Sequence, residues 1–193
     1  MPNFASIEAT GKSIERLLTA WFTADQPLTT GTTTAALVQS DDLDVGVEAF
    51  DGPAVSIYLY RVEPNAVMRA AWGGAGSIDG RSHLPLDLHF LLTAWATNAE
   101  YEYRILGAAL ECLDTTPILT GPLLYPTADW DDGDAIQLVP EHLEVDTVLR
   151  LFDSLEASFR LSMPYVARVV RIDGPVTNAP PAVGTTIAGA KPT

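Results

Sequence analysis

The hydrophobic and polar positions between Leu84 and Leu113 change period partway, which predicts a strand followed by a helix. In the first half apolar side chains occupy every second position, so they share one face of an extended strand. These positions are Leu84, Leu86, Leu88, Phe90, Leu92, Ala94 and Ala96. The opposite face is half polar and includes Asp87 and His89, so we expect a helix on one side of this strand only.

After the strand, apolar residues recur every three or four positions, which is the period of a helix. They are Tyr101, Ile105, Ala108, Ala109 and Leu113. Asn98 precedes them as the expected N-cap, and Glu100 and Glu102 fall in the first turn, where the helix dipole favours anions. A long strand that leads directly into an amphipathic helix is therefore the predicted structural centre.

Similar patterns predict two further helices, one at 6–22 and one that begins at Pro140. The buried stripe of the second helix is expected to be Leu143, Val148, Leu151, Phe152 and Leu155. Further strands are expected at 36–38, 54–62, 135–139 and 159–172. In the last strand, residues at every second position from Phe159 to Val169 are expected to face inward. Pro164 lies inside it, which predicts an edge strand or a bulge.

These elements predict an α/β (α+β) fold with one domain at 1–173. We expect a mixed, mostly antiparallel sheet packed with about three α-helices. A glycine-containing loop is expected at 63–81, and the Asp-rich segment at 41–44 is expected to be a turn. Residues 174–193 are rich in Pro, Ala, Gly and Thr, which predicts a flexible tail.

The charge balance excludes several classes of partner. The chain has 25 acidic and 11 basic residues and a net charge of −14, which argues against binding to nucleic acid or anionic membranes. We find no apolar run of membrane-spanning length and expect no signal peptide. Cys112 is the single cysteine, so no intrachain disulfide can form, and a reducing compartment is the simplest interpretation.

The candidate chemistry does not assemble into a catalytic pattern. Asp87 and His89 could form a metal or acid/base pair, but we favour a hydrogen-bonded structural pair. The acidic segment around Gly133 resembles a calcium loop, but Pro140 stands where the bidentate glutamate is needed, so a solvated turn is favoured. Glycines at 73, 74 and 76 do not complete a dinucleotide-binding motif. We expect Cys112 to be a core residue, and we expect no catalytic residue, metal or cofactor.

The order of three short motifs resembles a known family. Leu59, Tyr60 and Arg61 are followed by Pro64 and Asn65. A strand with a Leu-Asp-Leu-His-Phe-Leu-Leu-Thr-Ala pattern occupies 86–94, and a final strand carries Ser162, Tyr165 and Val169. This order is similar to that of the cap, or tail-terminator, proteins of phage-tail-like contractile injection systems.

The resemblance implies a structural protein that forms a hexameric ring, ends the inner tube and sheath, limits particle length and anchors the last sheath layer. Its expected partners are other copies of itself, the tube protein and the sheath protein. The expected location is the cytoplasm during assembly and then the particle. Candidate interface residues are Tyr58, Tyr60, Arg61, Asn65, Arg69, Trp72, Arg168 and Arg171, and we expect arginines such as Arg61 and Arg69 to meet carboxylates of a neighbouring chain. Two alternatives stay open: a baseplate or spike accessory of the same machine, and an unrelated small-ligand-binding module.

Overall fold

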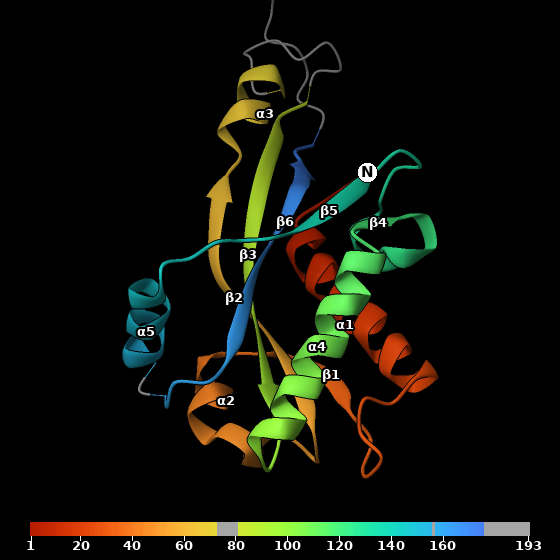
Figure 1. The fold of residues 1–193 in the computed structure, drawn as a ribbon. Coiled ribbons are helices and arrows are strands. Elements are labelled where there is room, and N and C mark those ends of the chain that lie inside the picture. The colour runs from red at the N-terminus through yellow and green to blue at the C-terminus, as the bar shows by residue number, and fades with distance from the viewer. Residues whose placement is uncertain (73–80, 156, 176–193) are drawn as a thin grey trace, which may run out of the picture.

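A computed structural model describes residues 1–72, 81–155 and 157–175 (Figure 1). In these ranges the α-helices are α1 (Ser6–Ala24), α2 (Ser40–Val45), α3 (Ala66–Trp72), α4 (Ala99–Thr115) and α5 (Val145–Ser154). The strands are β1 (Thr34–Val38), β2 (Ala54–Pro64), β3 (His83–Trp95), β4 (Ile118–Thr120), β5 (Ala135–Pro140) and β6 (Ser162–Asp173). Short 3-10 turns occupy Gly46–Ala49, Gly121–Leu123 and Pro126–Ala128.

The six strands form one sheet in the order β1-β2-β3-β6-β5-β4. β1 runs parallel to β2, and all other neighbouring pairs are antiparallel, which confirms the predicted mixed, mostly antiparallel sheet. β3 lies in the middle of the sheet, as the sequence predicted. Of the two alternatives predicted for the strand bearing Pro164, the edge strand is wrong, because β6 pairs with β3 on one side and with β5 on the other. The strand does contain a bulge, but the bulge lies at Arg168–Val169 and not at Pro164, which pairs with Leu91.

The inner face of the sheet packs against α1 and α4. Leu88, Phe90 and Leu92 of β3 are buried there, as the alternation predicted. Both helices contribute buried residues to the same core, including Ile14, Leu18, Phe22, Ile105, Ala109 and Cys112. Asn98 caps α4 as predicted, because its side-chain oxygen accepts a hydrogen bond from the Tyr101 backbone N–H at 3.0 Å. Burial raises the pKa of the Cys112 thiol to about 12.

The outer face of β3 is also covered, so the prediction that a helix packs on one side only is wrong for this strand. Leu91, Thr93 and Trp95 are buried on the outer face. The Trp95 indole N–H donates to Ser56 Oγ at 2.8 Å, and its ring lies 5.7 Å from that of Phe50. Figure 1 shows α2 and α5 on this side of the sheet, opposite α1 and α4. The covering segments lie far from β3 in sequence, so its own pattern gave no sign of them.

Two of the five helices lie where the sequence predicted irregular structure. α2 occupies the expected acidic turn, and α3 occupies part of the expected loop at 63–81. α3 forms because Asn65 caps it: Asn65 Oδ1 accepts a hydrogen bond from the Met68 backbone N–H at 2.9 Å. Residues 73–80 of that loop lie outside the described residues. The same holds for 176–193 of the expected tail, whose flexibility stays a prediction.

The last two predicted elements need correction. β6 begins at Ser162, so Phe159 and Leu161 precede it and are exposed. A bulge places both Arg168 and Val169 opposite Asp87, and the register resumes with Val170 facing the core instead of Val169. α5 begins at Val145 and not at Pro140, which is the last residue of β5, so Leu143 of the expected stripe precedes the helix. The expected stripe is largely half-buried, and Phe152 is its fully buried member.

Candidate functional site

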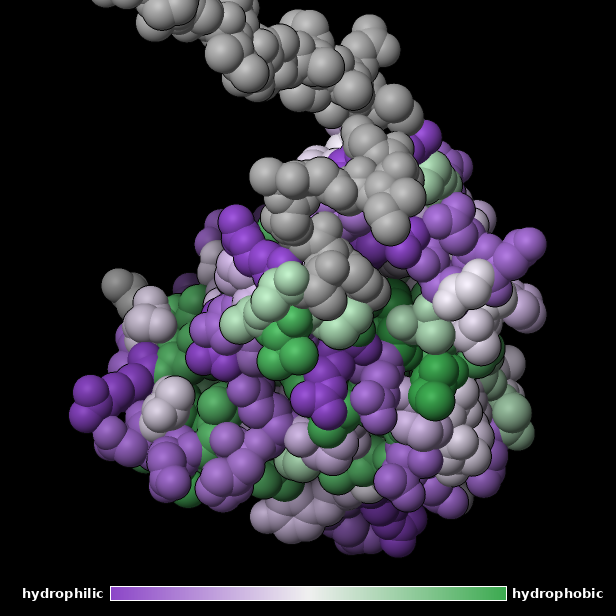
Figure 2. Space-filling view, turned by 90° about the horizontal axis from the view of Figure 1, so that it is seen from above, coloured by the Kyte–Doolittle hydropathy of each residue, from purple (hydrophilic) through white to green (hydrophobic). Residues whose placement is uncertain are grey.

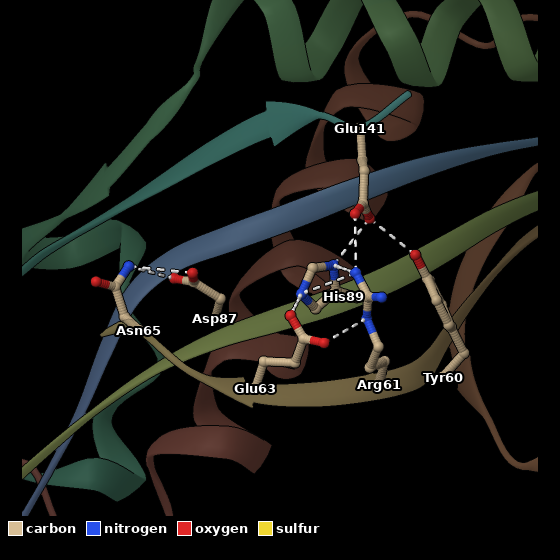
Figure 3. A network of polar contacts seen from close by, with 7 residues as sticks. All are labelled: Tyr60, Arg61, Glu63, Asn65, Asp87, His89 and Glu141. Carbon is tan, nitrogen blue, oxygen red and sulfur yellow. Dashed lines mark hydrogen bonds and ion pairs between the residues drawn. The ribbon is translucent and has the colours of Figure 1, made fainter. Parts of the chain in front are cut away.

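A network of polar side chains on the outer face of the sheet is centred on Glu141, the residue that follows β5 (Figure 3). Glu141 Oε2 accepts hydrogen bonds from the Tyr60 hydroxyl and from His89 Nδ1, both at 2.8 Å. Glu141 Oε1 accepts from Arg61 Nη2 at 3.0 Å. Glu63 lies at the rim, 3.5 Å from Arg61 Nε and 3.6 Å from His89 Nε2. The network therefore joins β2, β3 and the segment that crosses the sheet toward α5.

A bulge in β2 brings two consecutive side chains into this network. Leu59 pairs with Phe90 and Arg61 pairs with His89, so Tyr60 is the extra residue. Without the bulge, Tyr60 and Arg61 would point to opposite faces of the strand. With it, both side chains reach Glu141, as Figure 3 shows.

The surroundings shift the pKa values of two members of the network. Burial raises the pKa of the Tyr60 hydroxyl above its ordinary value, and the hydrogen bond to Glu141 adds to the effect. Burial acts to raise the pKa of Glu141 as well. The hydrogen bonds from His89 and Tyr60 and the charge of Arg61 outweigh that effect, so the net pKa of Glu141 is lowered. An ionised carboxylate only accepts hydrogen bonds, so His89 carries a proton on Nδ1.

The geometry is that of a structural clamp. The Glu141 carboxylate accepts hydrogen bonds from three side chains. The backbone N–H of Glu141 donates to the Pro164 carbonyl of β6 at 2.9 Å. His89 is 6% exposed on the central strand. A carboxylate whose lone pairs are used in this way has little capacity left for a substrate. The cluster therefore fixes the crossing segment to three strands at once.

Asp87 and His89, which we expected to bond as a pair, bind different partners. Asn65 Nδ2 donates to both Asp87 carboxylate oxygens at 3.0 Å, while His89 turns to Glu141. Because Asn65 also caps α3, this contact fixes the start of α3 against β3. The described residues contain no group of three or more His, Cys, Asp or Glu side chains placed to hold a metal ion.

A second ionic cluster surrounds Arg171 near the end of β6. Its guanidinium lies 2.9 Å from Asp131, 3.5 Å from Asp134 and 3.0 Å from Asp173. The N-terminal ammonium group of Met1 is 3.6 Å from Asp131. The acidic segment that resembles a calcium loop is thus partly neutralised by an internal arginine.

The predicted interface residues fall into three groups. Tyr60, Arg61, Asn65 and Arg171 have internal partners, as described above. Tyr58 is half-buried on the outer face, while Arg69 on α3 and Arg168 in the β6 bulge are exposed. Trp72 ends α3, and its side chain lies outside what the structure describes. Contact of any of these residues with a neighbouring chain stays a prediction.

The sequence-based prediction missed Glu141, which organises the network. Its partners Tyr60, Arg61 and His89 lie 81, 80 and 52 positions away in the chain. Glu141 follows a proline at the end of a short strand, a setting without a distinctive motif, so no local signal could have identified it.

The fold is similar to that of two solved terminators of contractile injection systems. It matches the cryo-EM structure of the sheath/tube terminator of the extracellular contractile injection system PVC in its extended state, with a TM-score of 0.57 and 19% identity over 95% of this chain and 65% of that chain. It also matches the tube-terminating cap of the anti-feeding prophage, with a TM-score of 0.57 and 16% identity over 95% of this chain and 60% of that chain. The chain spans less than two thirds of the length of both solved chains.

The family model of the Pvc16 N-terminal domain matches residues 9–185. The chain therefore belongs to the Pvc16 N-terminal domain family. No curated protein matches the chain. None of the helices within 1–72, 81–155 and 157–175 is both long and apolar enough to cross a lipid bilayer.

Proposed function

We propose that this chain is the cap, or tube terminator, of a contractile injection system and assembles as a six-fold ring at the end of the inner tube and sheath. The observation that carries the proposal is membership of the Pvc16 N-terminal domain family over residues 9–185. The fold shared with two solved terminators supports it. In this role the ring stops tube and sheath growth, sets particle length and holds the last sheath layer.

The chemistry of the outer face supports a structural role, and we propose that the chain is not an enzyme. Glu141 and His89 are used to fasten the crossing segment to the sheet. The proposed partners are copies of this chain, the tube protein and the sheath protein. Nucleic acid is not among them, because a net charge of −14 opposes binding to phosphate backbones. The proposed location is the cytoplasm during assembly and the particle afterwards.

The test is deletion of the gene from a particle-producing strain, followed by electron microscopy of the particles. A terminator predicts tubes and sheaths of uncontrolled length, or ends that disassemble, and restoration by the wild-type gene. A baseplate or spike accessory predicts a defect at the opposite end. Particles of normal length with both ends intact would contradict the proposal.

Complementation with single variants sharpens the result. Arg168→Glu is suitable because Arg168 is exposed and no polar partner is found for it among the described residues, so folding should be unaffected. Arg61→Glu also disturbs the internal bonds to Glu141, so its melting temperature must be compared with that of the wild type. If Arg168 faces a neighbouring chain, Arg168→Glu should partly reproduce the deletion defect while the variant melts like the wild type.

A further inference from the structure

α5 carries more apolar surface than the fold covers. Its apolar positions span one broad side of the helix, and Phe152, which is 1% exposed, anchors that side to the body of the protein. Val145 is 70% exposed, and Leu149 is also exposed. Because Val145, Leu149 and Phe152 recur every three or four residues, they form one stripe. The stripe is buried at one end and open to solvent over the rest.

The open stripe continues into a groove beside α4. The ring of Phe159 packs edge-on against that of Phe152, with centroids 5.6 Å apart, while Phe159 itself is 52% exposed. Phe159, Leu161 and Tyr103 line a groove of about 630 Å³. We call the exposed apolar residues Tyr103, Val145, Leu149, Phe159 and Leu161 the α5 surface. Exposed apolar residues that join in this way mark a site of protein association.

One border of the α5 surface is acidic. Asp146, Leu149 and Asp153 follow one another at helical spacing, so two carboxylates flank the exposed leucine. Asp146 is paired with Arg150 at 2.8 Å. Asp153 is exposed, and no cationic partner is found for it within the described part of the chain. The surface therefore fits an apolar partner segment with a cation beside it.

α3 has this complementary chemistry. Its Val67 is 79% exposed, and Ala66 and Ala70 are exposed beside it. Arg69 lies on the same helix and is exposed, and no polar partner is found for its side chain within 1–72, 81–155 and 157–175. Figure 2 views the molecule from the α3 end and shows hydrophobic side chains reaching the surface among hydrophilic ones.

The two surfaces cannot meet within one molecule, because Figure 1 shows α3 at one end of the sheet and α5 toward the other. We propose that α3 of one copy packs on the α5 surface of the next copy, with Arg69 facing Asp153. Two different patches meet in such a contact, so it is head-to-tail, and each copy keeps one free surface for the next. Repetition closes into a ring when the rotation between copies allows it. The inference rests on the proposed ring-forming function and identifies the surfaces that form the ring.

Disulfide trapping tests the contact directly. The native Cys112 is buried and its thiol pKa is raised, so introduced cysteines are the reactive ones. A chain with both Val67→Cys and Leu149→Cys should form a ladder of linked copies under mild oxidation. A mixture of the two single variants should stop at dimers, each with one chain of either kind. Ile118→Cys, which places a cysteine at an exposed position of β4, is the matched control and should give no ladder when combined with Leu149→Cys.

The reaction is run on concentrated purified chain and on purified particles. The inference is overturned if the 67–149 link is absent from both preparations. It is also overturned if dimers linked 67–67 or 149–149 form in the same yield as the 67–149 link. Charge reversal adds a second measurement. Arg69→Glu or Asp153→Arg should each lower the yield of the 67–149 link roughly two- to fivefold, as expected for an exposed ion pair, and the two together should restore it. If charge reversal leaves the yield unchanged, the assignment of the Arg69–Asp153 pair is overturned.

The trapping result and the gene-deletion result can be told apart. The 67–149 link requires only that copies of this chain meet, with no tube or sheath present. If the double-cysteine variant forms a ladder but deletion of the gene leaves normal particles, the contact is supported and the cap function is contradicted. If deletion gives particles of uncontrolled length but no 67–149 link forms on particles, the cap function is supported and the contact is contradicted.

Discussion

The two faces of β3 are stabilised by different kinds of contact. On the inner face Leu88, Phe90 and Leu92 pack against α1 and α4, and apolar burial of this kind does not depend on direction. On the outer face Asp87 and His89 make hydrogen bonds with fixed partners and geometry. The contacts of Leu88, Phe90 and Leu92 on the inner face are therefore apolar, whereas those of Asp87 and His89 are polar and directional. The outer face determines where α3 and the crossing segment lie, and these carry the surfaces proposed for assembly.

Leu88→Asp breaks the inner face and should have the largest effect. Loss of a buried leucine side chain costs about 2–5 kcal/mol, and an unpaired buried carboxylate adds to that cost. The sum approaches the whole stability of a typical domain, about 5–15 kcal/mol, so we expect the variant to be unfolded. Circular dichroism melting is the measurement. Leu84→Asp is the control on the same face, because Leu84 is exposed, and a wild-type melt for Leu88→Asp would contradict the core assignment.

Trp95→Ala tests the apolar end of the outer face. Removal of this buried ring should lower the free energy of unfolding by about 3–5 kcal/mol. Trp95→Phe keeps an aromatic ring but leaves Ser56 Oγ without its indole donor, so it should cost about 1–2 kcal/mol. Both values come from denaturant unfolding. A loss below about 1 kcal/mol for Trp95→Ala would mean that the outer layer adds little to the fold.

Glu141→Gln tests the polar end of the outer face. The change removes the charge that His89, Tyr60 and Arg61 share, and we expect a loss of about 1–2 kcal/mol in the free energy of unfolding. Glu63→Gln is the matched control. Glu63 is more exposed and its contacts are longer, so that change should cost less than about 0.5 kcal/mol. Equal losses for the two variants would show that Glu141 is not the centre of the network.

The pH dependence of stability should show the smallest effect. The pKa of Glu141 is lowered in the folded state, so its contribution is fully present above the ordinary carboxyl pKa of about 4.3. That contribution is lost as the pH falls through the lower pKa of the folded protein. The difference in unfolding free energy between wild type and Glu141→Gln should therefore shrink as the pH is lowered from about 7 to about 3. A difference that stays constant over this range would contradict the assigned direction of the pKa shift.

The inner face could be predicted from the sequence because its signals are local. The alternation along β3, the helical period of α4 and the Asn98 cap are each formed by residues that lie close together in the sequence. The outer face depends on long-range contacts that no such pattern encodes. Arg61 meets Glu141 across 80 positions, and the bulges at Tyr60 and at Arg168–Val169 are set by pairing between distant strands. The sequence therefore identified Tyr60 and Arg61 as noteworthy but could not identify their partner.

The strand order has a consequence for how the chain folds during synthesis. Among the described residues β6 is the last strand along the chain, yet it lies between β3 and β5 near the middle of the sheet. Until residues 162–173 leave the ribosome, no strand pairs β1-β2-β3 with β4-β5, so each group of strands has an open edge where β6 will bind. Open strand edges bind other chains, so the nascent protein is most vulnerable to aggregation just before its last strand emerges. A ribosome that stalls before Ser162 would release a chain that cannot close its sheet.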